Sequence, residues 1–115
     1  MADSPLIIKS KEFALQIIKV CNYVKQTKKE TVLTNQLIRS GTSIGANVSE
    51  AQRGQSKADF NAKMNIALKE ANETDYWLRL LHQSGYLTEA EFQSIFADCQ
   101  EIEKLLAAIV KTSKK

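Results

Sequence analysis

The sequence predicts an all-α fold, an antiparallel up-down-up-down four-helix bundle made by one domain of residues 1–115. The first observation is composition, because residues that favour helices dominate and the chain has only one proline and four glycines. The second is that apolar residues recur at intervals of three and four in four separate segments. The third is that connections of about three to five residues join these segments, which makes successive helices antiparallel neighbours.

The first helix is predicted over residues 5–28. Ser4 is suited to cap it. Pro5 suits its first turn, because the N–H groups there have no hydrogen-bond partner within the helix and proline lacks this group. Its inner apolar stripe consists of Phe13, Ile17, Val20, Cys21 and Val24. The polar run at 25–30 is expected to end this helix.

The second helix is predicted over residues 32–53, with Gly54 as its stop. Its core face alternates by four and three residues and consists of Leu33, Leu37, Gly41, Ile44, Val48 and Ala51. Gly41 and Gly45 would each cost a helix interior ~1 kcal/mol relative to alanine. We therefore expect both glycines to serve close packing against another backbone.

The third helix is predicted to begin after Ser56 and to run to about residue 84, where Gly85 stops it. Its core face consists of Phe60, Met64, Ala67, Ala71, Leu78 and Leu81. The fourth helix is predicted to begin at Thr88, because Glu91 completes a capping box. Its apolar residues are Phe92, Ile95, Phe96, Cys99, Ile102, Leu106, Ile109 and Val110. The tail 111–115 is expected to fray.

A second apolar stripe on the third helix predicts self-association. Ile66, Trp77 and Leu80 lie roughly 100–160° around the helix from its core face. A stripe that contains tryptophan and isoleucine is typical of a subunit interface. The alternative is that this side packs deeper into a wide bundle.

The second helix has a small and ionic face opposite its core face. That face consists of Arg39, Ser43, Ala46, Glu50 and Arg53. Such residues permit tight packing with specific ion pairs, so we expect an oligomer interface in which Arg39 or Arg53 pairs with a carboxylate of another subunit. The alternative is a solvated face.

The sequence predicts no enzyme, no cofactor and no metal site. A di-iron centre in a helical bundle needs Glu-x-x-His pairs, and the only histidine, His82, has Arg79 three residues before it. Cys21 and Cys99 fall on apolar stripes and are interpreted as buried thiols. No segment approaches the ~20 apolar residues that span a bilayer, and no signal peptide is evident, so we expect a cytoplasmic protein.

Charge is distributed unevenly along a chain whose net charge is +3. Residues 1–69 contain eleven Lys and Arg against five Asp and Glu, whereas residues 70–115 contain five against eight. One hypothesis is therefore a non-enzymatic oligomer that binds nucleic acid, RNA or DNA, through its basic surface. The candidate phosphate contacts are Lys9, Lys11, Lys19, Lys25, Lys28 and Lys29. The other hypothesis is a protein-interaction scaffold that never contacts nucleic acid.

Four runs of residues resemble the small proteins encoded in bacterial 23S rRNA intervening sequences. The runs are Leu37-Ile-Arg-Ser-Gly-Thr-Ser-Ile-Gly-Ala-Asn-Val-Ser-Glu-Ala-Gln52, Asp59-Phe60, Lys63-Met-Asn-Ile-Ala-Leu-Lys-Glu-Ala71 and Glu73-Thr-Asp-Tyr-Trp-Leu-Arg-Leu-Leu81. This resemblance implies a homopentamer of four-helix bundles. It also implies kinship with the accessory variability determinant of diversity-generating retroelements, a basic pentameric barrel that works with a reverse transcriptase and nucleic acid. The resemblance carries over no catalytic residue.

Overall fold

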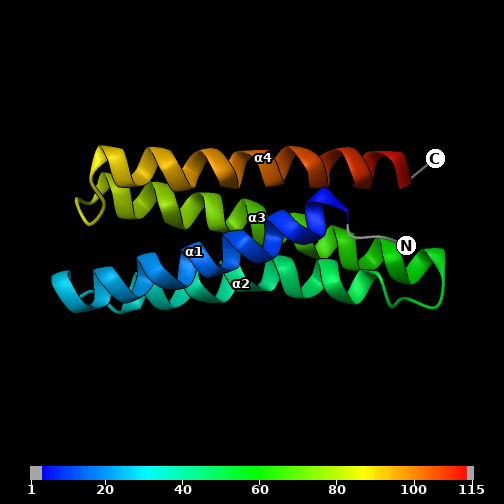
Figure 1. Ribbon diagram of the computed structural model, residues 1–115, viewed down its shortest axis with the longest axis horizontal. Helices are drawn as coiled ribbons and strands as arrows, with labels where there is room; N and C mark the ends of the chain where they lie inside the picture. The colour runs from blue at the N-terminus through cyan, green and yellow to red at the C-terminus, as the bar shows by residue number, and fades with distance from the viewer. Residues whose placement is uncertain (1–3, 114–115) are drawn as a thin grey trace.

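The computed structural model describes residues 4–113, which form four helices. They are α1 (Pro5–Lys28), α2 (Val32–Ala51), α3 (Lys57–Gln83) and α4 (Glu89–Ser113). Successive helices run side by side in opposite directions (Figure 1), and no strand occurs among the described residues. The predicted all-α four-helix bundle is confirmed. No helix within residues 4–113 combines the length and apolar composition that crossing a membrane requires.

The helix ends follow local capping interactions. The Ser4 side chain accepts a hydrogen bond from the Ile7 N–H, and the Ser56 side chain accepts one from the Asp59 N–H. Thr88 and Glu91 form the reciprocal bonds of a capping box, at 2.8 and 3.2 Å. These interactions involve residues three apart in sequence, which is why the starts of α1, α3 and α4 were predictable to within about one residue.

Helix α2 begins at Val32 as predicted, but its cap was not predicted and its C-terminal end differs from the prediction. Its first turn is capped by Glu30, whose carboxylate accepts hydrogen bonds from the N–H groups of Leu33 and Thr34 at 2.8 and 2.9 Å. The helix ends at Ala51, two residues before the predicted end at Arg53. The end is earlier because Gln52, Arg53 and the residue after it donate to carbonyls three residues back, which tightens the chain into turns.

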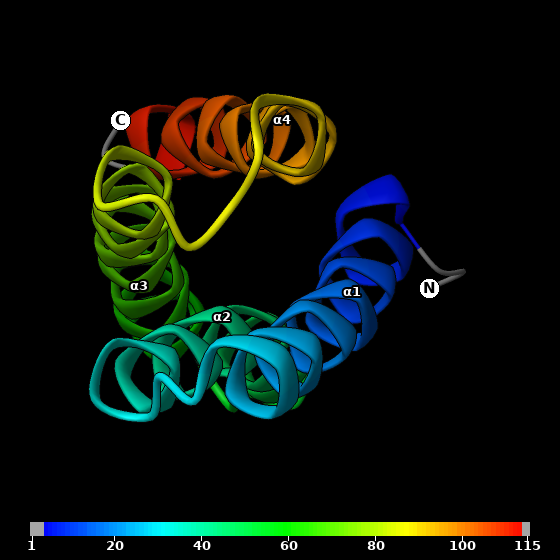
Figure 2. The same cartoon turned by 90° about the vertical axis from the view of Figure 1, so that its left-hand side faces the viewer.

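A single hydrophobic core lies between the four helices, which surround it in chain order (Figure 2). The largest fully buried side chains come from every helix and include Phe13, Ile17, Leu37, Met64 and Leu106. Four members of the predicted core stripes, namely Val20, Leu33, Phe60 and Ile109, are only partly buried against this core. In the predicted tail, residues 111–113 continue α4, and Lys114 and Lys115 lie outside the described residues.

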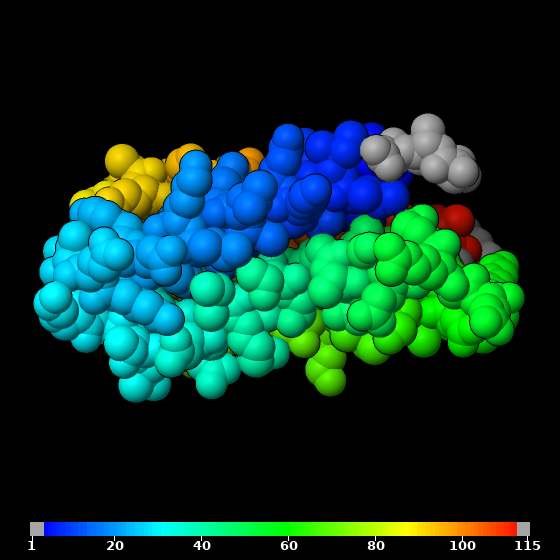
Figure 3. All heavy atoms as spheres, turned by 60° about the horizontal axis from the view of Figure 1, so that its bottom comes forward, coloured from blue at the N-terminus to red at the C-terminus, as the bar shows by residue number. Residues whose placement is uncertain are grey.

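Gly41 and Gly45 lie where α2 contacts α1, and the atoms of these two helices pack side by side (Figure 3). A Cβ atom on Gly41 would come within 2.9 Å of the Ile17 side chain. A Cβ atom on Gly45 would lie 3.3 Å from the backbone carbonyl oxygen of Ser10. The contact at Gly45 is therefore between two backbones, whereas the contact at Gly41 is between a backbone and a core side chain.

Candidate interaction surface

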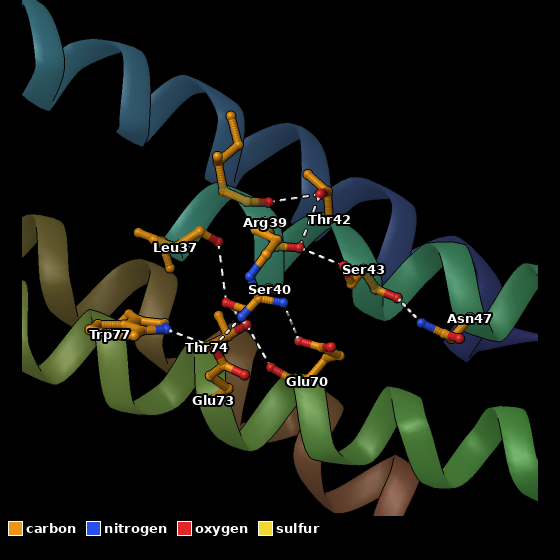
Figure 4. Close-up of polar contacts among 11 residues, drawn as sticks. Leu37, Arg39, Ser40, Thr42, Ser43, Asn47, Glu70, Glu73, Thr74 and Trp77 are labelled. Carbon is orange, nitrogen blue, oxygen red and sulfur yellow. Dashed lines mark hydrogen bonds and ion pairs between the residues drawn. The ribbon is translucent and has the colours of Figure 1, made fainter. Parts of the chain in front are cut away.

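An ionic network joins α2 to α3 at the edge of the bundle (Figure 4). The Arg39 guanidinium pairs with the carboxylates of Glu70, at 3.3 Å, and of Glu73. The indole N–H of Trp77 donates to the same Glu73 carboxylate at 3.1 Å. The network therefore ties the Trp77 ring to the α2 side of α3.

The expectation that Arg39 or Arg53 pairs with a carboxylate of another subunit stays a prediction. Within the chain, the ion-pair partners of Arg39 lie on α3. Glu50 likewise pairs within the chain, with Lys63 at 2.8 Å. The reason is that this face of α2 turns partly towards α3, so its charged side chains reach carboxylates and ammonium groups there. Ser43 donates to the Arg39 carbonyl at 2.6 Å, and Arg53 forms no ion pair within residues 4–113.

The electrostatics of the network favour the charged forms of Arg39 and Glu73. The indole hydrogen bond from Trp77, helped by Arg39, lowers the pKa of Glu73. The Glu73 carboxylate in turn raises the pKa of Arg39. Both side chains are substantially exposed, and exposed ion pairs contribute little to stability. The network therefore orients side chains more than it stabilises the fold.

Two buried hydroxyls lie beneath the network, between α2 and α3. Thr74 Oγ1 is 2.9 Å from Ser40 Oγ and 2.8 Å from the Glu70 carbonyl oxygen. Ser40 Oγ is 3.3 Å from the Leu37 carbonyl oxygen. Both hydroxyls therefore have partners, as buried polar groups require. Sequence reasoning did not identify this pair, because Ser40 and Thr74 lie on different helices and carry no motif.

The predicted apolar stripe of α3 is partly covered. Ile66 is 41% exposed, while Leu80 is half-buried and Trp77 packs against the core. The more exposed member of this face is Tyr76, at 56%, and its ring contacts Trp77 edge-on with centroids 5.0 Å apart. Trp77 is therefore partly buried within the bundle, whereas Ile66 and Tyr76 present apolar surface to solvent, and the subunit interface at this face stays a prediction.

The six candidate phosphate contacts lie along α1 and at its end. Lys9 pairs with Glu101 of α4 at 3.1 Å, and Lys25 donates to the Asn35 side chain at 2.6 Å. Of these six, the lysines that are exposed and form no ion pair within residues 4–113 are Lys11, Lys19, Lys28 and Lys29. Lys28 is the last residue of α1 and Lys29 follows it, so both lie at the end of the bundle where α1 connects to α2 (Figure 1).

A titratable cluster between α3 and α4 was not predicted from the sequence. Arg79 pairs with Asp75 at 2.6 Å and lies 4.6 Å from the centroid of the Phe96 ring. Burial, and then the neighbouring Asp75, raise the pKa of Glu103 to about 8. His82 stacks on Phe92 and lies 2.9 Å from Glu89. The five titratable members come from two helices, α3 and α4, and the sequence does not state how these helices are rotated relative to each other.

The two cysteines are free and buried. Burial raises the pKa of the Cys21 thiol to about 11 and raises that of Cys99 further. Neither thiol is therefore activated as a nucleophile. Within residues 4–113, no group of three or more His, Cys, Asp or Glu side chains is placed to hold a metal ion.

The fold and these surfaces define an all-helical bundle protein, and nothing within residues 4–113 points to catalysis. The sequence profile of the 23S rRNA-intervening sequence protein family matches residues 3–108, and the chain belongs to this family. It is also similar to a protein of unknown function from the S23 ribosomal protein family of Bacteroides thetaiotaomicron, with 51% identity and a TM-score of 0.90. That match covers 92% of this chain and 98% of that crystal structure. The comparison with curated proteins gives no match.

Proposed function

We propose that this protein is a non-enzymatic homo-oligomer, with a pentamer as the expected assembly, that binds RNA through the basic end of α1. The observation that carries the proposal is the position of exposed lysines without ion pairs. Lys28 and Lys29 lie next to Lys25 at one end of the bundle, while α4 carries five carboxylates against two lysines. Family membership supports the proposal, because the resemblance described above implies kinship with a basic pentameric barrel that works with nucleic acid.

The physical basis of binding is attraction between ammonium groups and phosphates. A single bundle offers few cations, so its affinity for RNA is expected to be low. Several copies in one assembly repeat the same patch, and simultaneous contacts with one RNA raise the overall affinity. Tyr23, which is 46% exposed, offers a ring for base stacking about one turn from Lys19. Contacts dominated by phosphates predict little sequence preference.

A salt titration with a generic single-stranded RNA tests this function. Each phosphate contact adds about 0.7 to the slope of log affinity against log salt. The triple variant Lys25→Glu, Lys28→Glu, Lys29→Glu should abolish binding while the oligomer persists, as measured by fluorescence anisotropy and light scattering. The matched control, Lys57→Glu, Lys104→Glu, Lys111→Glu, makes the same change in charge at exposed positions elsewhere and should retain most of the affinity. Equal loss in both variants would contradict the assignment to α1.

The alternative is a protein-interaction scaffold, and the acidic character of α4 favours it for a basic partner. Wild-type protein without affinity for RNA or DNA at low salt would favour the scaffold. A pull-down from native lysate with and without nuclease separates the two functions, since a partner bridged by RNA is lost after nuclease treatment.

A further inference from the structure

The large apolar side chains exposed within residues 4–113 fall into two groups. The first group lies on α1 and at the start of α2 and consists of Ile8, Leu15, Tyr23 and Val32, which are 46–71% exposed. The second lies on α3 and consists of Ile66 and Tyr76. None lies on α4. A single exposed apolar residue needs no explanation, but two separate groups on long helices do.

The two groups contain patches that face away from the core in different directions. Ile8 and Leu15 are about two helical turns apart, on the side of α1 opposite the buried Phe13 and Ile17. We call Ile8 and Leu15 the α1 patch, and Ile66 and Tyr76 the α3 patch. Viewed along the bundle, α1 and α3 lie on opposite sides of the core (Figure 2). One partner surface therefore cannot cover both patches of the same copy.

We propose that the α1 patch of one copy packs against the α3 patch of the next copy. This inference rests on the self-association in the proposed function and names the surfaces that meet. Charge favours this pairing over a contact between two α1 helices. Helix α1 carries five lysines and one glutamate, so an α1–α1 contact would oppose two basic faces. Helix α3 carries four Lys or Arg and four Asp or Glu, and it includes Glu73 beside the patch.

A contact between two different surfaces propagates head to tail. It cannot close as a twofold dimer that buries both patches, and it closes into a ring when the rotation between copies permits. Lys28 and Lys29 lie at the end of the bundle, outside the α1 patch, so the RNA contacts proposed above stay accessible in such an assembly. Lys11 and Lys19, which flank the α1 patch, would be partly covered.

Complementation between two variants tests the pairing. Leu15→Asp breaks the α1 patch and keeps the α3 patch, while Ile66→Asp does the reverse. Each variant alone should be a folded monomer by circular dichroism and analytical ultracentrifugation. Mixed at equal concentrations, they should form a 1:1 complex with twice the chain mass, because one intact contact remains and no further copy can add. Ala108→Asp, at an exposed position on α4, is the control that should assemble like wild type.

The outcomes separate this inference from the proposed function. A monomeric wild-type protein overturns both the self-association and this pairing. If wild type assembles but the mixture stays monomeric, or if Leu15→Asp assembles like wild type, only the pairing is overturned. If either variant fails to fold, Ile8→Asp and Tyr76→Asp break the same two patches and give the same mixing experiment.

Discussion

Helices α2 and α4 are held by their neighbours in different ways. Against α1, α2 relies on the close approach at Gly41 and Gly45, and against α3 on the buried Ser40–Thr74 hydroxyl pair. The polar contacts of α4 with its neighbours are made by titratable side chains, including the Lys9–Glu101 ion pair with α1. A small cleft lined by Phe13, Ile102 and charged residues also lies between α1 and α4. The comparison indicates that steric fit and a buried hydroxyl pair hold α2 in addition to its exposed ion pairs with α3. Helix α4 lacks such a close approach of backbones in this comparison, and its Glu103, whose pKa is raised, makes its contact with α3 depend on pH.

The largest effect should come from filling the space at Gly45. Gly45→Leu would force the new side chain against the Ser10 backbone, which cannot rotate away, and should destabilise the fold by about 2–3 kcal/mol. Gly41→Leu should act in the same direction against the Ile17 side chain. Thermal melts measure both, with Ala46→Leu on the exposed face of α2 as the control. Unchanged or raised melting temperatures would refute the packing role of the glycines.

The next effect should come from the hydroxyl pair between α2 and α3. Thr74→Val keeps the shape of the side chain but removes the hydrogen bond between Thr74 and Ser40, so the Ser40 hydroxyl keeps only the Leu37 carbonyl as a partner. We expect the free energy of unfolding, measured in urea, to fall by about 1–2 kcal/mol. Adding Ser40→Ala should then cost less than it does in the wild-type background, because the two hydroxyls interact. Strictly additive costs would show that the pair is not coupled.

The contact between α3 and α4 should depend on pH through Glu103. Its pKa is about 8 in the folded chain, above the ordinary value of 4.5, so the folded state holds the proton more tightly. The stability contributed by the protonated carboxyl is therefore present below about pH 4.5 and is lost as pH rises through about 8. Glu103→Gln should raise the melting temperature above that of wild type at pH 9, and should differ less from wild type at pH 5. Solvent screening limits the difference to roughly a few degrees.

Glu12→Gln is the matched control for the pH experiment, because Glu12 is an exposed carboxylate on α1. This variant should show the same difference in melting temperature between pH 5 and pH 9 as the wild-type protein. Parallel melting curves for Glu103→Gln and wild type at both pH values would contradict a titrating group in the α3–α4 contact.

The smallest effect should come from the ion pair between α1 and α4. The side chains of Lys9 and Glu101 are 39% and 52% exposed, so Lys9→Ala should cost only about 0–0.5 kcal/mol in urea unfolding. The cost should disappear at high salt, since screening weakens exposed pairs. If Lys9→Ala lowers the free energy of unfolding by more than about 1 kcal/mol and the effect persists at high salt, the contact between α1 and α4 depends on packing more than on this ion pair.

Local sequence determined much of this protein. The capping box at Thr88 and Glu91, the N-cap at Ser4 and the periodic apolar residues predict four helices with nearly correct ends. The family resemblance could likewise be identified from residues 37–81. These features are predictable because a helix and its caps depend on residues no more than four positions apart.

Tertiary structure alone decided how the helices are rotated against one another. That rotation paired Arg39 with Glu70 and Glu73 inside the chain, and it placed Glu103 beside Asp75. It also covered part of Trp77 while leaving Tyr76 exposed. Helical spacing states which residues share a face, but the direction in which a face points depends on packing between segments distant in sequence. The lysines and the apolar stripe could therefore be named from the sequence, whereas the existence of two patches on opposite sides became visible only in the folded bundle.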